Sequence, residues 1–156
     1  ANGNLTPKDI FEIAEGRAEG NVNAAREAFS QLGKAAADSV IHALDIIDGL
    51  VVIGGGLSGA AKYIVPAMKE QMRSRLSTFG GDHFPCLQSQ VYDLNDAEEL
   101  AEFLRDDSTL VQVPGAERSV RYRNSRKTGI AVSSIGTSTA IALGAYAFAL
   151  NNLNKS

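Results

Sequence analysis

The sequence has few cysteines and prolines, and this scarcity excludes several classes of protein. It has one cysteine, Cys86, among 156 residues, so no disulfide can form within the chain and a disulfide-stapled scaffold is excluded. Proline is scarce at four residues, glycine is somewhat frequent at 15, and 44% of the residues are hydrophobic. These counts argue against collagen-like and intrinsically disordered chains. We therefore expect a single folded domain over residues 1–156.

Long apolar runs and a strong excess of one charge are also lacking. No segment reaches the roughly 20 apolar residues that cross a bilayer, and the polar residues 1–4 do not begin a signal sequence. The net charge of −3 gives no general attraction to nucleic acid or to an anionic membrane. The lone cysteine favours a reducing compartment, so we expect a cytoplasmic protein. A chain that begins at Ala1 rather than methionine suggests a processed protein or a piece of a longer one.

Two helices are predicted before any strand. Thr6 is suited to cap a helix with Pro7 at its first position, and this helix should end near Gly16. From Asn21 or Asn23 onward, apolar residues recur at spacings of three and four, which predicts a long amphipathic helix. Its expected buried stripe is Ala25, Phe29, Leu32, Ala36, Val40, Ala43 and Ile47.

The most informative segment is a short apolar run followed at once by glycines. Residues 50–53, Leu-Val-Val-Ile, lack polar alternation, which is typical of a central strand covered on both faces. Residues 54–59, Gly-Gly-Gly-Leu-Ser-Gly, come next, and a helical pattern then runs from about Ala60 to Leu76. Glycines without Cβ let backbone N–H groups approach a ligand at the start of a helix, and a nucleotide is the natural ligand of such a turn.

The second half of the chain is predicted as shorter elements. Its composition indicates a loop over residues 77–90, a brief strand at 91–92 and a strand at 109–113. Residues 120–122 and 130–132 bracket a polar turn, which predicts that they pair as a hairpin.

Two further helices complete the prediction. Asn95, with Glu98 three residues later, is typical of the capped start of a short helix. The last helix begins at residues 136–138, runs through Leu150 and has almost no polar face. We expect it to be buried against a second lobe, a subunit or both.

The glycines admit two other interpretations. Gly54, Gly56 and Gly59 match the dinucleotide-binding pattern G-x-G-x-x-G, which also needs an acidic residue at the end of the next strand about 20 residues later. The first acid that ends a predicted strand is Asp93, which lies too far along the chain. The glycines could alternatively make a tight turn with no ligand.

Two weaker patterns favour plain structural explanations. Asp82, His83 and Cys86 are close enough in sequence to share a metal, but structural zinc usually takes four ligands and no second Cys/His pair is present. Basic residues gather near the predicted hairpin, which favours a solvated hairpin over a nucleic-acid site in an acidic chain. They are Arg118, Arg121, Arg123, Arg126 and Lys127.

Residues 50–58, Leu-Val-Val-Ile-Gly-Gly-Gly-Leu-Ser, resemble the adenosine-binding segment in the C-terminal lobe of ROK-family sugar kinases and regulators. The flanking segments agree with this resemblance. Residues 5–11 resemble the entry to the family's helical section, residues 24–29 the helix before the glycine strand, and residues 140–147 the closing helix. The similarity therefore covers most of the chain.

The resemblance implies an α/β fold that is the C-terminal half of a two-lobed actin-like ATPase fold of the ribonuclease H-like type, with a helical N-terminal section. It implies that the purine or ribose of ATP contacts Gly54, Gly55, Gly56, Leu57 and Ser58. The family's D-x-G-x-T phosphate loop, aspartate base and cysteine-rich zinc motif have no counterpart in the sequence. No catalytic residue and no metal ligand are therefore assigned within residues 1–156.

The implied function is the nucleotide-binding lobe of an ATP-dependent kinase of glucose or a related hexose, with ATP and Mg as cofactors of the full-length protein. The missing lobe would bind most of the sugar and supply the base and the phosphate loop, so we expect this lobe to be inactive alone. We also expect a homo-oligomer. Two alternatives remain open. One is the effector lobe of a ROK-type sugar-responsive transcriptional regulator, and the other is a nucleotide-free dimerisation module.

Overall fold

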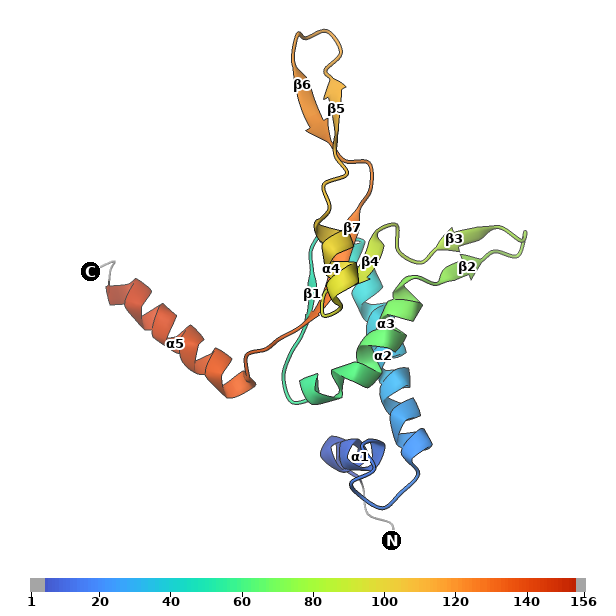
Figure 1. Ribbon diagram of the computed structural model, residues 1–156, viewed down its shortest axis with the longest axis vertical. Coiled ribbons are helices and arrows are strands. Elements are labelled where there is room, and N and C mark those ends of the chain that lie inside the picture. Colours follow the sequence, from blue (N-terminus) through green and yellow to red (C-terminus); the bar gives the residue numbers. More distant parts are fainter. Residues whose placement is uncertain (1–4, 154–156) are drawn as a thin grey trace.

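The computed structural model describes residues 5–153, which form five α-helices, one 3₁₀ turn and seven short strands (Figure 1). In chain order these are α1 (Pro7–Ala14), α2 (Val22–Leu44), β1 (Val51–Ile53), η1 (Ser58–Ala60), α3 (Ala61–Met72), β2 (Arg75–Ser77), β3 (His83–Pro85), β4 (Gln90–Asp93), α4 (Ala97–Leu104), β5 (Thr109–Gln112), β6 (Ser119–Tyr122), β7 (Lys127–Val132) and α5 (Thr137–Leu153). The fold is mixed α/β, as the sequence predicts.

The two N-terminal helices begin where the sequence places them. The Thr6 side chain accepts a hydrogen bond from the N–H of Asp9, and the Asp9 carboxylate accepts one from the N–H of Thr6, which completes a capping box. Asn21 caps α2 by accepting a hydrogen bond from the N–H of Ala24 at 3.1 Å. Each cap satisfies backbone donors that the first turn of a helix leaves without partners.

The main sheet has three parallel strands in the order β1-β7-β4. Its central strand is β7, in which Ile130 pairs with Val51 on one side and Asp93 on the other and has no exposed surface. The prediction of a central strand at residues 50–53 is wrong for the described residues, because β1 lies at an edge and Val52 is 63% exposed. An apolar run indicates that a strand becomes covered, but it does not say which other segments cover it.

The predicted hairpin between residues 120–122 and 130–132 is also wrong. β6 pairs antiparallel with β5, with Val111 opposite Val120, whereas β7 runs parallel to both of its neighbours. Short apolar runs next to one another in sequence predict a hairpin by proximity. Here the most buried run, β7, instead fills the middle of the parallel sheet, where both of its edges are hydrogen-bonded.

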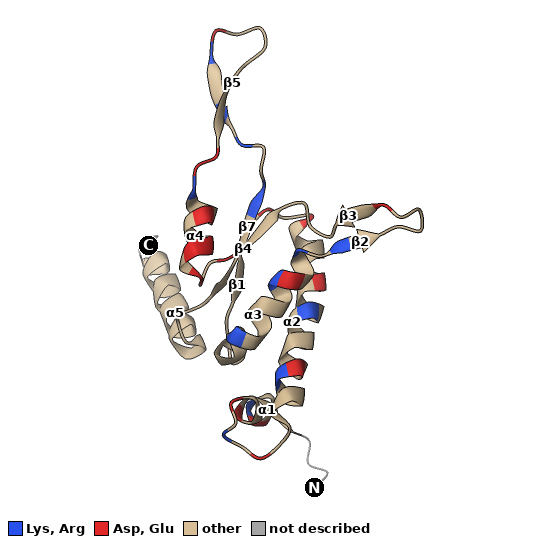
Figure 2. Ribbon diagram, turned by 45° about the vertical axis from the view of Figure 1, so that its right-hand side comes forward, with Lys and Arg blue, Asp and Glu red and all other residues tan. Residues whose placement is uncertain are grey.

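The core lies between the sheet and the pair α2 and α3, which lie side by side (Figure 2). The α2 residues that are buried follow a strict spacing of four: Ala25, Phe29, Gly33, Ala37 and Ile41. The predicted stripe is therefore only partly right, since Leu32 and Ile47 are exposed. The two helices approach so closely that a Cβ on Gly33 would lie 2.5 Å from the carbonyl oxygen of Ile64 in α3. Position 33 requires glycine for this reason, a requirement that a pattern of apolar residues does not predict.

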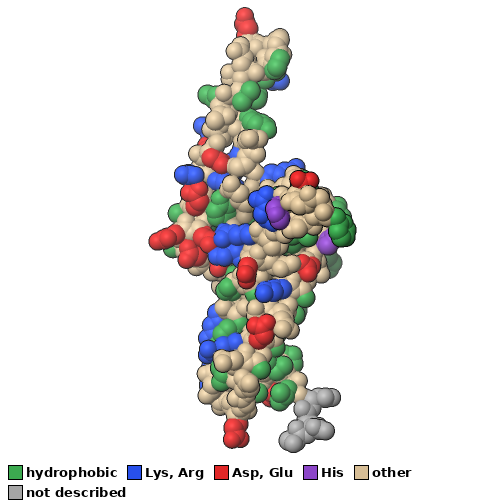
Figure 3. Space-filling model, turned by 90° about the vertical axis from the view of Figure 1, so that its right-hand side faces the viewer, with side chains coloured by type: hydrophobic (Ala, Val, Ile, Leu, Met, Phe, Trp, Pro, Cys, Tyr) green, Lys and Arg blue, Asp and Glu red, His purple; other side chains and the backbone are tan. Residues whose placement is uncertain are grey.

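Several boundaries differ from the sequence prediction. α3 ends at Met72 rather than Leu76, and the predicted loop over 77–90 is partly a hairpin in which β2 pairs with β3. The other hairpin, β5–β6, stands clear of the body with apolar side chains along it (Figure 3). The exposed apolar residues on β5–β6 are Leu110, Val111, Val120 and Tyr122.

The last helix, α5, lies apart from the core, and none of its residues is buried by the rest of the described chain. Residues 137–153 include no charged side chain, so the helix is uniformly tan in Figure 2. The expected burial of this helix is therefore not provided by residues 5–153. None of the helices in this range is both long and apolar enough to cross a membrane.

We predict that Gly33→Ala lowers the free energy of unfolding by about 1–3 kcal/mol, because the added methyl group overpacks the α2–α3 contact. This loss should exceed the gain of about 1 kcal/mol that alanine normally brings to a helix interior. Urea unfolding followed by circular dichroism measures the change. Gly144→Ala in α5 is the matched control, because its new Cβ meets nothing within 4 Å. Equal stability of Gly33→Ala and the unaltered chain would contradict the close contact.

Candidate functional site

The carboxyl ends of the three parallel strands lie at one edge of the sheet. β1 ends at Ile53, β7 at Val132 and β4 at Asp93. Ligands of open parallel sheets bind outside the carboxyl ends of the strands, where the connecting loops meet. The glycines at 54–56 directly follow β1, so the structure places the sequence-predicted site residues at this edge.

The glycine turn, residues 54–58 between β1 and α3, has the backbone geometry that its sequence requires. Gly55 has a positive φ of 86°, which side chains other than glycine adopt at a cost. Its carbonyl oxygen accepts hydrogen bonds from the N–H of Ser58 at 3.1 Å and from the Ser58 hydroxyl at 2.8 Å. These bonds close the turn and lead the chain through η1 into α3. The predicted order of strand, glycine turn and helix is therefore confirmed, with a 3₁₀ turn between the glycines and the helix.

The surface of the turn is open. A Cβ placed on Gly55 or Gly56 would meet no atom within 4 Å, and Leu57 is 36% exposed. Backbone groups at these positions can therefore be reached from outside the chain. This is the arrangement in which glycines permit close approach of a ligand to a backbone.

A second segment, which sequence analysis missed, lies against the turn. The N–H of Ser133 donates to the carbonyl oxygen of Ile53 at 2.8 Å, and a Cβ on Gly54 would lie 3.7 Å from the Cβ of Ser133. Ser133 directly follows the central strand, so it lies beside the glycines only because β7 pairs with β1. No signal in the sequence alone points to that pairing.

A cavity of about 280 Å³ adjoins the same edge, between the sheet and the start of α3. Its polar lining comes from Lys62, Asp93 and Asn95, and Val132 is among its apolar lining residues. A larger hollow of about 420 Å³ lies near the start of β4, beside Arg73 and Gln88. We favour the smaller cavity as part of the functional site, because it lies at the carboxyl ends of the strands.

Asp93 also decides against the dinucleotide interpretation. In that fold the acidic residue that binds ribose ends a strand closely following the glycine strand in sequence. Here Asp93 ends β4, and β7 lies between β4 and the glycine strand β1. The distance in sequence and the strand order therefore both depart from the dinucleotide pattern.

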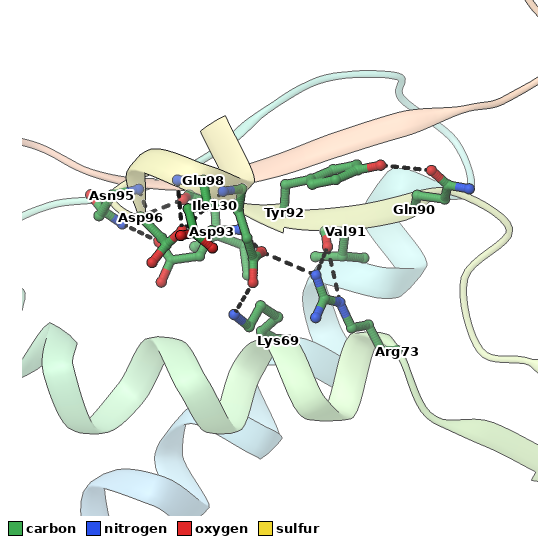
Figure 4. Close-up of polar contacts among 11 residues, drawn as sticks. Lys69, Arg73, Gln90, Val91, Tyr92, Asp93, Asn95, Asp96, Glu98 and Ile130 are labelled. Atoms are coloured by element: carbon green, nitrogen blue, oxygen red, sulfur yellow. Dashed lines mark hydrogen bonds and ion pairs between the residues drawn. The ribbon is translucent and has the colours of Figure 1, made fainter. Parts of the chain in front are cut away.

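A charged cluster around Glu99 fixes β4 and α4 against α3. Lys69 and Arg73 of this cluster point from α3 toward β4 (Figure 4). The Glu99 carboxylate accepts hydrogen bonds from the Lys69 ammonium at 2.6 Å, from the backbone N–H of Asp93 at 2.7 Å and from the Arg73 guanidinium at 3.1 Å. Arg73 also donates to the carbonyl oxygen of Val91. Burial alone would raise the pKa of Glu99, but the bonds from Lys69 and Asp93 and the charge of Arg73 outweigh it and lower the pKa.

The residues weighed for a metal site do not come together. His83 Nδ1 contacts the Ser77 hydroxyl at 2.9 Å, and Cys86 contacts the hydroxyl of Ser74 at 3.1 Å. Within residues 5–153, no three His, Cys, Asp or Glu side chains are arranged to hold a metal ion. The short sequence spacing of Asp82, His83 and Cys86 therefore has no counterpart in a shared site.

Most of the basic residues near β6 form ion pairs with acidic side chains. Arg121 pairs with Asp106 at 3.0 Å, and Arg123 pairs with Asp107 at 2.8 Å. Lys127 is nearly buried and lies 3.6 Å from Asp107. These pairs neutralise much of the charge that a nucleic-acid surface would need.

Comparisons with known proteins support the interpretation of the chain as similar to a sugar kinase. The crystal structure of a glucokinase from Parabacteroides distasonis matches 97% of the chain at 45% sequence identity, with a TM-score of 0.78. The match covers 40% of the glucokinase, so the chain spans less than half the length of the protein that it resembles. No protein-family profile and no curated protein matches the chain. The predicted resemblance to a glucokinase-like sugar kinase is thus confirmed, over a stretch equal to 40% of that glucokinase.

We predict that Glu99 stabilises the fold at neutral pH and loses this effect in acid. Because the pKa of Glu99 in the folded chain lies below its ordinary value of 4.5, its contribution is present above that value and is lost as the pH falls through the folded pKa. Glu99→Gln should therefore lower the free energy of unfolding at pH 7, and its difference from the unaltered chain should shrink between about pH 5 and pH 3.

Urea unfolding at several pH values tests this expectation. Glu98→Gln is the matched control, because it removes the same charge from the same helix and the Glu98 carboxylate has no hydrogen-bond partner in the described part of the chain. A difference between Glu99→Gln and the unaltered chain that is constant over this pH range would contradict the prediction.

Proposed function

We propose that the chain is the nucleotide-binding C-terminal lobe of an ATP-dependent sugar kinase of the ROK type, which phosphorylates glucose or a related hexose in a longer protein. The observation that carries the proposal is the 45% identity to a glucokinase over 97% of the chain. The position of the glycine turn at the carboxyl edge of a parallel sheet supports it independently, because nucleotides bind at such edges.

Each residue of the turn has a distinct part in this proposal. Gly54, Gly55 and Gly56 bring the backbone close to the purine or ribose of the nucleotide. Leu57 offers a partly exposed apolar surface to the base. The Ser58 hydroxyl already donates to the carbonyl oxygen of Gly55, so Ser58 holds the turn and its oxygen can still accept a hydrogen bond from the ligand.

The remaining chemistry of phosphoryl transfer is assigned to the rest of the longer protein. Transfer needs Mg²⁺, contacts that position the phosphates and a base that orients the sugar hydroxyl. We assign none of these to residues 5–153, so the lobe binds nucleotide but does not phosphorylate sugar alone. ATP with Mg is the phosphoryl donor of the longer protein, which we place in the cytoplasm.

Two exposed surfaces support a larger, actin-like two-lobed fold. The outer edge of β1 has no neighbouring strand in the described residues, and α5 exposes apolar side chains such as Ile141 and Phe148. A helix that is apolar all round is normally covered on most sides. In the proposed protein, the part outside this chain covers both surfaces.

We predict that Gly55→Val abolishes binding of an adenine nucleotide. Valine is β-branched and is strained at a φ of 86°, and its side chain would occupy the space through which the ligand approaches. Titration of ADP into the ¹⁵N-labelled chain, followed by amide chemical shifts, measures binding even when it is weak. The loss of affinity should be at least about tenfold, equivalent to 1.4 kcal/mol.

Gly49→Val is the matched control, because position 49 is open and lies outside the turn. Shifts at residues 54–58 that saturate in the unaltered chain and in Gly49→Val, but not in Gly55→Val, support the proposal. Unchanged affinity in Gly55→Val would place the nucleotide elsewhere. Self-association of the chain without any nucleotide binding would favour the dimerisation module, for which the exposed α5 is the supporting observation.

We predict that the chain alone produces no sugar phosphate from glucose and ATP with Mg²⁺, whereas the protein encoded together with its upstream sequence does. A coupled assay for ADP release with and without glucose measures this activity. An upstream sequence with a D-x-G-x-T loop, an aspartate base and a cysteine cluster would support the kinase. An upstream helix-turn-helix would favour the regulator, and glucose-dependent turnover by the 156-residue chain alone would contradict the division of roles.

A further inference from the structure

The central strand β7 extends beyond its neighbour β4 at their carboxyl ends. β4 ends at Asp93, which pairs with Ile130, while β7 continues to Val132. The N–H of Leu94 donates to the carbonyl oxygen of Ile130 at 2.9 Å and is the last backbone bond of this ladder. Beyond it, the N–H of Val132 has no backbone partner on the side of β4.

The side chain of Asn95 supplies that partner. Its Oδ1 accepts a hydrogen bond from the N–H of Val132 at 3.0 Å. Its Nδ2 donates to Oδ1 of Asp93 at 2.7 Å, and the same Asp93 oxygen accepts a bond from the N–H of Asn95 at 3.0 Å. Figure 4 shows Asn95 and Asp93 joined at the end of β4. A side-chain amide has the same donor and acceptor groups as a peptide, so Asn95 extends the ladder by one step.

This role replaces the one that the sequence predicts for Asn95. The start of α4 is capped by Asp96, whose carboxylate accepts bonds from the N–H groups of Glu98 and Glu99 at 3.0 and 2.9 Å. The prediction of Asn95 as the cap is therefore wrong by one residue. Because α4 does not use the Asn95 side chain as its cap, the polar contacts of Asn95 at β7 need a separate explanation.

The opposite edge of β7 is held at the same level. The N–H of Ser133 donates to the carbonyl oxygen of Ile53 at 2.8 Å, and Ser133 then lies against Gly54. The segment that leaves β7 is therefore fixed between Asn95 on one side and the start of the glycine turn on the other. Its position sets how much room remains beside the turn.

We propose that Asn95 is a positioning residue of the nucleotide site, which holds Val132 and Ser133 in place beside the glycine turn. The inference rests on the proposed function and adds a residue to that same site. Binding groups must be held within about 0.5 Å of their productive positions, and residues behind them provide this support. Asn95 also lines the adjoining cavity of about 280 Å³ together with Lys62 and Asp93.

The test compares ADP binding by the unaltered chain, Asn95→Ala and Asn95→Asp in the ¹⁵N titration. Asn95→Ala removes the acceptor for the N–H of Val132, so the amide signals of Val132 and Ser133 should move in the free chain. We expect its affinity for ADP to fall about fivefold, the effect of one net hydrogen bond. Asn95→Asp keeps an acceptor for the N–H of Val132, so its Val132 signal should stay nearer that of the unaltered chain. It loses the donor to Asp93 and sets two carboxylates side by side, so its affinity should lie between the other two.

Asn124→Ala is the control and should retain the original affinity, because Asn124 is exposed and precedes the start of β7, whereas the site lies at the carboxyl end of that strand. A well-dispersed spectrum of each variant shows that it is folded. ADP binding that is equally tight in the unaltered chain and in Asn95→Ala, despite moved Val132 and Ser133 signals, would overturn the inference alone. Absence of saturable ADP binding by the unaltered chain would overturn the proposed function and the inference with it.

Discussion

The fold depends on the central position of β7. Ile130 is completely buried, and strands on both sides of it are parallel to β7. Thr128, two residues earlier in β7, is also buried. Its hydroxyl donates to the carbonyl oxygen of Gly49 at 2.8 Å, which ties β7 to the segment that leads into β1. Because all three strands point the same way, their carboxyl ends and the groups that follow them meet at one edge. The candidate site is a consequence of this parallel pairing.

The ion pairs of the chain differ in how far they are exposed to solvent, and therefore in how much they stabilise the fold. Around Glu99, one carboxylate accepts bonds from two basic side chains and a backbone N–H, so the charge is compensated where solvent is partly excluded. The pair of Arg121 with Asp106 is far more exposed than that of Lys69 with Glu99, and such exposed pairs contribute little to stability. The cluster at Glu99 therefore fixes β4 and α4, and through them the edge of the sheet that carries Asn95.

The surfaces that the described residues leave uncovered agree with the chain's similarity to only part of a longer protein. The chain corresponds to 40% of the glucokinase that it matches, and it has a sheet edge at β1 and an uncharged helix α5 that its own described residues do not cover. A two-stranded hairpin such as β5–β6 is also marginal without further packing. The residues between α2, α3 and the sheet form a buried core, whereas the edge of β1, the helix α5 and the β5–β6 hairpin remain exposed.

The sequence by itself determined the features that depend on neighbouring residues. The caps at Thr6 and Asn21, the glycine turn after an apolar strand and the resemblance to a sugar kinase are all local patterns, and each could be identified without coordinates. Only the tertiary structure decided that β7 rather than β1 is central, that Gly33 faces α3, and that Asn95 binds β7. These choices join segments far apart in the chain, and the apolar or polar character of a residue does not specify which distant backbone it will meet.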